Sequence, residues 1–102
     1  MMIKSMGIIV DRADNVCTVV TEVKKDSVVI CKYSKHLKEE IKIYAKNDIP
    51  VFHKIAIEDL SQGIDIVKYG EIIGKAKKSI CKGEHVHIHN VDSKRVQGDL
   101  DR

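Results

Sequence analysis

The chain is poor in the residues that define several common classes of protein. It has no tryptophan, one phenylalanine and three tyrosines. Aromatic side chains that could stack on bases are therefore scarce, and none interleaves with the basic clusters at residues 24–25 and 75–78. The formal net charge of +3 is also too small for an electrostatic nucleic-acid footprint. We expect no nucleic-acid partner.

Cysteines and long apolar runs are equally scarce. Cys17, Cys31 and Cys81 show no CxxC spacing, so the sequence predicts neither a disulfide framework nor a structural zinc site. No run approaches the roughly 18 apolar residues of a membrane span. Residues 1–10 place Lys4 within a short apolar run and lack the small-residue cleavage pattern of a signal peptide. We expect a cytoplasmic protein that has no membrane contact.

The apolar residues that are present are mostly β-branched. There are 15 Ile and 12 Val against 3 Leu and 4 Ala. β-branched side chains are stiff at χ1 and fit a pleated surface better than a helix. We predict one all-β domain over residues 1–91, followed by a polar C-terminal tail over residues 92–102 that orders on a partner. The polar stretch 34–40 is the most helix-like piece of the chain, but it is too short to contribute to the core.

Hydrophobic alternation and turn residues divide this domain into strands. Residues 3–10 and 16–23 flank a turn rich in Asp and Asn, which predicts a first hairpin. Later strands are predicted at residues 27–33, 41–44, 53–57, 64–69 and 84–90.

Three histidines alternate along the last of these segments. In a strand, His85, His87 and His89 would share one face, with neighbouring Cα atoms about 6.6 Å apart. Imidazole titrates near neutrality and binds borderline metals, so the row indicates a site. The alternative is a half-buried strand with a polar solvent face. His87 and His89 alone do not complete a metal site. A further ligand would come from His53, His85 or a partner chain.

The second half of the chain also carries three motifs that resemble one family. They are Ile49-Pro50-x-x-His53-Lys54-x-Ala56-x-x-Asp59-x-x-x-Gly63, Val67-Lys68-Tyr69-Gly70-Glu71-x-Ile73-Gly74 and Gly83-Glu84-His85-Val86-His87-x-His89-Asn90. With matching gaps, they resemble the amino-terminal SAF-type module of the altronate and galactarate dehydratase family, which includes the small subunits of sulfolactate sulfo-lyases. Residues 95–100 resemble the family's Arg-Gly-Asp-Leu stretch with the Arg-Gly step altered.

This resemblance implies a fold and an activity. The fold is a β-clip, an all-β module with long hairpins. The activity is that of a two-chain lyase, usually a hydro-lyase, which eliminates water or sulfite from a sugar acid or related hydroxy acid. The chain would be the small subunit, inactive without a large catalytic subunit, and it could also form a homo-oligomer. The alternatives are a non-catalytic module that binds a sugar acid or an assembly partner and, less favoured, a His-rich metal-binding protein.

The resemblance also implies candidate site residues. Dehydration removes a proton α to a carboxylate and expels a β-hydroxyl, which requires a base, an acid and positive charge. Candidates for the acid and base are His53, His87 and His89. Candidates for holding the substrate are Lys54, Lys68, Tyr69 and Asn90. A divalent metal, Fe²⁺ or Mn²⁺, could be shared with the large subunit, and its candidate ligands here are His87 and His89. We expect these two histidines to face a cleft together with Lys68 or His53, whereas the family motif is satisfied without His85.

Overall fold

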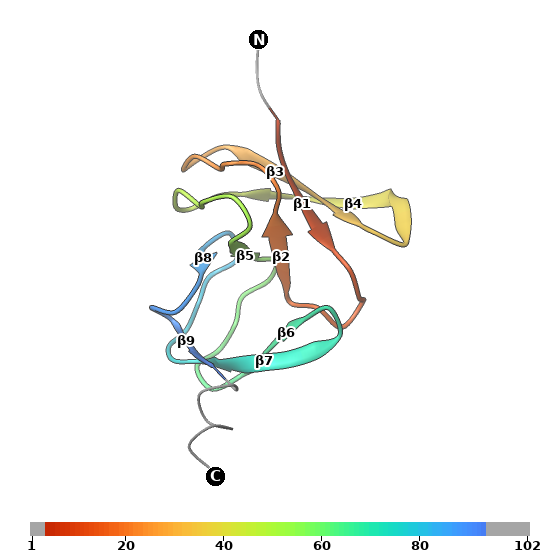
Figure 1. The fold of residues 1–102 in the computed structure, drawn as a ribbon. Coiled ribbons are helices and arrows are strands. Elements are labelled where there is room, and N and C mark those ends of the chain that lie inside the picture. The colour runs from red at the N-terminus through yellow and green to blue at the C-terminus, as the bar shows by residue number, and fades with distance from the viewer. Residues whose placement is uncertain (1–3, 94–102) are drawn as a thin grey trace.

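The computed structural model describes residues 4–93, although not the side chain of Leu37. Within this range the chain forms nine strands and no helix, which confirms the predicted all-β fold class (Figure 1). The strands are β1 (Ser5–Ile9), β2 (Val16–Val19), β3 (Val28–Tyr33), β4 (His36–Tyr44), β5 (Lys54–Ala56), β6 (Asp65–Lys68), β7 (Glu71–Ala76), β8 (His85–Val86) and β9 (Val91–Ser93). No helix in this part of the chain is long and apolar enough to cross a membrane.

The strands form two sheets. The larger has six strands in the order β4-β3-β1-β2-β5-β8, and the smaller has three in the order β6-β7-β9. Figure 1 shows the smaller sheet below the larger one, with β5, β8 and β9 on the same side of the molecule. The predicted first hairpin is confirmed, because β1 and β2 pair antiparallel with Gly7 opposite Val19. On its other edge β1 pairs with β3 in parallel.

Two buried apolar clusters, made largely of Ile and Val, form the core, and the second draws on both sheets. The first cluster contains Ile9, Cys17, Val19, Val23, Val29, Cys31, Ile43, Ala45, Ile49 and Ile55. The second contains Val16, Ala56, Leu60, Ile66, Ala76, Ile80 and Val86. Gly7 lies beside the first cluster, where a Cβ atom would collide with the thiol of Cys17. The absence of a side chain at this position therefore allows the cysteine to pack over β1.

The polar stretch 34–40 is not helix-like, as the sequence had indicated, because most of it belongs to strand β4. Tyr33 pairs with His36 across a bulge at the end of the β3–β4 hairpin. Arg12, from the β1–β2 loop, reaches this hairpin and lies 2.6 Å from Glu39. Pairing with β3 therefore overrides the weak local preference of a polar segment for helix.

Two polar residues before β2 connect the sheets. The side chain of Asn15 acts like a peptide group: its Oδ1 accepts a hydrogen bond from Val67 N–H at 2.8 Å, and its Nδ2 donates to the carbonyl of Asp65 at 2.8 Å. Beside it, Asp14 Oδ1 accepts a hydrogen bond from Gly70 N–H at 2.8 Å. Asn15 and Asp14 are both buried. They hold the tip of the β6–β7 hairpin beside the six-stranded sheet.

The start of the predicted tail belongs to the smaller sheet. Asp92 pairs with Lys75 and Ser93 with Gly74, so that β9 forms an edge of the sheet next to β7. The rest of that tail, residues 94–102, lies outside the described residues, together with the altered motif at 95–100.

Candidate functional site

The histidine segment 84–90 is not one continuous strand, and the prediction of a strand is wrong beyond Val86. Strand β8 ends there, and residues 87–90 turn back toward β9. Asn90 closes this turn. Its Oδ1 accepts a hydrogen bond from His87 N–H at 2.9 Å, and its Nδ2 donates to the carbonyl of His85 at 2.9 Å. The side-chain amide replaces the ladder hydrogen bonds that a longer strand would make.

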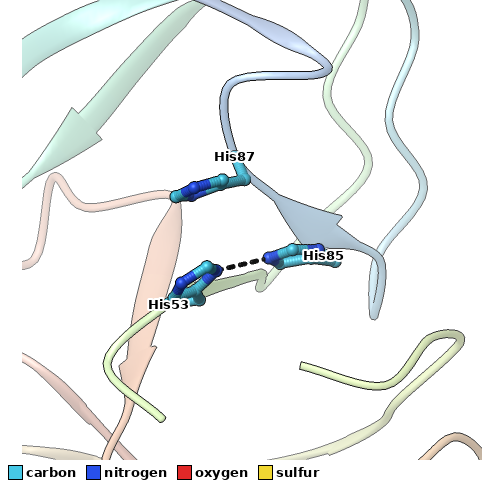
Figure 2. Close-up of side chains that lie close together, drawn as sticks. All are labelled: His53, His85 and His87. Carbon is cyan, nitrogen blue, oxygen red and sulfur yellow. Dashed lines mark hydrogen bonds between the residues drawn. The ribbon is translucent and has the colours of Figure 1, made fainter. Parts of the chain in front are cut away.

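Three imidazole rings meet at this point, from His53, His85 and His87 (Figure 2). Nδ1 of His53 lies 2.9 Å from Nε2 of His85. The ring of His87 stacks on that of His53, with centroids 4.1 Å apart and planes 19° apart. One ring nitrogen from each histidine lies within 4.8 Å of those of the other two. Side chains that lie far apart in sequence, with a separation of 32 residues from His53 to His85 and two more to His87, thus converge on a small volume.

Backbone hydrogen bonds fix the histidines on both sides of the cluster. His53 precedes β5, and its carbonyl accepts a hydrogen bond from Val19 N–H at 2.9 Å. His85 begins β8, where it pairs with Ile55 of β5. Its N–H donates to Oδ1 of Asn47 at 2.9 Å. The sequence analysis assigned no role to Asn47, and the one available signal was its place in the turn before Pro50.

The structure brings His85 into the cluster and leaves His89 at its edge. His89 is exposed, and its ring contacts that of His85 with centroids 5.3 Å apart and planes 40° apart. His85 was named only as a possible further metal ligand, because the family motif is satisfied without it. The alternation of histidines drew attention to His85, but its contact with His53 follows from the pairing of β8 with β5.

A cavity of about 190 Å³ adjoins the cluster. Its lining residues are Lys54, Ile73, His87, Ile88, Val91 and Ser93. His87 faces this cavity with Lys54 beside it, whereas His89, His53 and Lys68, which were expected to share a cleft with it, are not in the lining. The volume is below the range of about 300 to 1,000 Å³ that is usual for small-molecule sites. Asn90 is also absent from the lining; it is 2 % exposed, with both ends of its amide bound to the loop.

Two lysines add positive charge next to the histidines. Lys54 is partly buried on β5, and its pKa is lowered by burial and then by the charge of Lys68. Lys68, at the end of β6, lies with its Nζ 4.7 Å from the centre of the Tyr69 ring. The hydroxyl of Tyr69 is 3.5 Å from Oγ1 of Thr18. Within residues 4–93 no carboxylate forms an ion pair with either lysine. The site therefore presents cations without a counter-charge, which favours an anionic ligand.

The same surroundings keep two of the imidazoles neutral. Burial lowers the pKa of His85 to about 4, with further lowering by the nearby His53 and His89. The pKa of His87 is also lowered, first by burial and then by His53 and Lys54. At neutral pH both rings therefore carry a free nitrogen lone pair, which can accept a proton or bind a cation.

Comparisons with known proteins bear on this site. Residues 5–94 match the family model described as the altronate/galactarate dehydratase SAF domain. The (2R)-sulfolactate sulfo-lyase subunit alpha of Chromohalobacter salexigens is 36% identical over 85 residues, which are 83% of this chain and 90% of that protein. The same subunit of Paracoccus pantotrophus is 43% identical over 56 residues, 55% of this chain and 84% of that protein. The altronate dehydratase of Bacillus subtilis is 46% identical over 50 residues, 49% of this chain and 10% of that protein.

Proposed function

Because this chain belongs to the altronate/galactarate dehydratase SAF domain family, we propose that it is the small subunit of a two-chain lyase. The observation that carries the proposal is the match along most of both chains with a sulfo-lyase subunit alpha. An altronate dehydratase, by contrast, contains a matching segment as a minor part of its length. The large catalytic chain is then a separate polypeptide that binds this one.

The proposed reaction is an elimination from a hydroxylated carboxylic acid. A base removes the proton on the carbon next to the carboxylate, and the electron pair of that C–H bond forms a carbon–carbon double bond. The group on the adjacent carbon leaves with its bonding electrons, either as hydroxide that is protonated to water or as sulfite. A resulting enol becomes a 2-oxo acid by proton transfer to carbon. The substrate loses only a proton and its leaving group, so no redox step is involved.

The histidines are suited to the proton transfers. His87 faces the cavity with a neutral ring at pH 7, which is the form that accepts a proton. His53 and His85 share a short contact between ring nitrogens, in which the N–H of one ring donates a hydrogen bond to the other ring. His53 also stacks on His87, and this places a second titratable ring next to the proposed base. His89 stays a candidate because it contacts the group through His85.

The two lysines are suited to the negative charge. Lys54 lines the cavity beside His87, where its ammonium can hold the substrate carboxylate and the charge that grows on it as the proton leaves. Lys68 adds a second positive charge near Lys54, and Tyr69 adds a hydroxyl donor. The small volume of the cavity supports a shared site, which a surface of the large chain would complete.

Three free thiols support the cytoplasmic location, at Cys17, Cys31 and Cys81.

Copurification and assay test this proposal. The chain is isolated from the organism that encodes it, the copurifying polypeptide is identified, and both chains are assayed separately and together with (2R)-sulfolactate, altronate and galactarate. We expect turnover of one of these acids by the mixture and none by the small chain. Sustained elimination by the small chain would overturn the two-chain arrangement. An acid that binds the mixture without turnover would instead favour the non-catalytic binding module.

A further inference from the structure

We infer that His53, His85 and His87 form a binding site for one divalent transition-metal cation of the kind that prefers imidazole nitrogen, such as Zn²⁺, Co²⁺, Fe²⁺ or Mn²⁺. This deepens the proposed function by naming the cation of the same site, and it rests on that function for the role of the cation. The ligand set itself is read from the geometry of the three rings. It differs from the set expected from the sequence, because His85 replaces His89.

The spacing of the ring nitrogens suits a single cation. Metal–nitrogen bonds of about 2.1 Å place two ligand nitrogens of one site roughly 3 to 4 Å apart. Nδ1 of His53 and Nε2 of His85 are 2.9 Å apart, and all three nitrogens lie within 4.8 Å of one another. The ring of His87 stacks on that of His53 and contributes the third nitrogen of the group.

The backbone around the rings is held by groups that are not ligands. Asn47 binds the N–H of His85, and Asn90 binds both the N–H of His87 and the carbonyl of His85. These hydrogen bonds fix the backbone positions from which the rings of His85 and His87 project. The cluster is therefore a prepared arrangement, unlike a group of histidines on mobile surface side chains.

The site is also open on one side. His87 lines the cavity, so a cation held by the three histidines would have free positions toward Lys54 and the substrate. Three protein ligands and an open position are typical of catalytic sites, whereas structural sites are closed by four. When bound, the cation would supply positive charge to a substrate oxygen.

Lys54 opposes this binding. It lines the cavity together with His87, so its ammonium would repel a cation bound at the cluster. Within residues 4–93 no Asp or Glu joins the three histidines as a ligand. We therefore expect cation affinity to increase when the lysine charge is removed, whereas removal of a histidine ligand should lower it.

Isothermal titration of the full chain without a polyhistidine tag, with Zn²⁺ and separately Co²⁺, tests the site. We expect one cation per chain, a loss of affinity of about 100-fold or more for His53→Ala, His85→Ala and His87→Ala, and tighter binding for Lys54→Met. His36→Ala, on β4, is the matched control and should bind like the parent chain. Absence of binding by the parent chain, or a loss caused by His89→Ala but not by His85→Ala, would overturn the inference.

A measurement on the unaltered chain covers the case in which a variant does not fold. Zn²⁺ should shift the ring ¹⁵N resonances of His53, His85 and His87 in an NMR titration and leave those of His36 in place. Shifts at His36 instead, or at none of the histidines, would overturn the site. A chain that binds no cation but supports elimination with its partner contradicts this inference alone. A chain that binds the cation and supports no elimination with the identified partner contradicts the proposed function alone.

Discussion

Nδ1 of His53 and Nε2 of His85 face each other across 2.9 Å, so one of these nitrogens carries a proton and the other accepts its hydrogen bond. A proton on both nitrogens would direct two N–H groups at each other. The pair therefore excludes the doubly protonated state in this geometry, and His87 adds a third ring that is stacked on His53. The consequences of this contact can be measured.

The first prediction concerns the titration of His85. In the absence of added metal, its ring should titrate with a pKa of about 4, because burial and neighbouring histidines disfavour the charged form. The reference value for an exposed histidine is about 6.5. Between these values the unfolded chain binds more protons than the folded one, so the contribution of His85 to the free energy of unfolding is fully present above about pH 6.5 and is lost as the pH falls toward 4.

NMR titration of the ring measures this pKa, and urea denaturation at pH 7 and pH 5 measures the linked stability. His85→Gln is the control, because it removes the titrating group. The loss of stability between the two pH values should be smaller for this variant than for the parent chain. An equal loss in both chains would show that other groups account for it.

The second prediction concerns His87 in the assembled enzyme. Replacing His87 by Ala should lower kcat by about 100-fold or more, because the residue that lines the cavity beside Lys54 is the proposed base. His36→Ala, in strand β4, serves as the control for a histidine outside the cluster. Turnover by the His87 variant at the parental rate would remove this residue from the mechanism.

The third prediction concerns Asn90. Asn90→Ala should lower the free energy of unfolding by about 1 to 3 kcal/mol, because it leaves His87 N–H and the carbonyl of His85 without their partner. Asn47→Ala removes one exposed hydrogen bond to His85, so its effect should be smaller. Chemical denaturation measures both variants. Equal effects would mean that the buried turn is no more important than the exposed contact.

The fourth prediction concerns the connection between the sheets. Asn15→Ala should also cost about 1 to 3 kcal/mol, since Val67 N–H and the carbonyl of Asp65 lose the side chain that binds both. Asn15→Asp keeps an acceptor for Val67 but replaces the donor to Asp65 with a charged oxygen, so it should not restore the parental stability. Thermal and urea denaturation distinguish these outcomes, and a fully stable Asp variant would contradict the assigned donor.

Much of the fold could be predicted from the sequence, because the preference for sheet depends on the type of side chain. An excess of Ile and Val predicts sheet wherever they occur, and the matched motifs between residues 49 and 90 identified the family correctly. The stretch 34–40 was not accessible in this way. Its strand conformation depends on pairing with β3, which a local pattern of polar residues does not reveal.

The candidate site was accessible in part. The motifs drew attention to His53, Lys54 and His87, and the structure brings them to one place. The role of His85 depends on its register opposite Ile55, and periodicity along one strand does not reveal the register between two. Asn90 ends the alternation that made the segment look like a longer strand, and a side chain that replaces backbone pairing leaves no periodic signal.

The order of strands in the larger sheet determines when the histidine cluster can form during folding. β1 pairs in parallel with β3, and β5 joins β2 after the whole β3–β4 hairpin has intervened in the chain. Successive hairpins cannot assemble such a sheet by zipping, and non-local pairings of this kind are slow to form because they require closure of long loops. β8 is at the far edge, next to β5, and it carries His85. The three imidazoles thus meet through the pairing of β5 with β8, which joins Ile55 to His85, and in a refolding experiment we expect their resonances to reach native positions later than those of the β3–β4 hairpin.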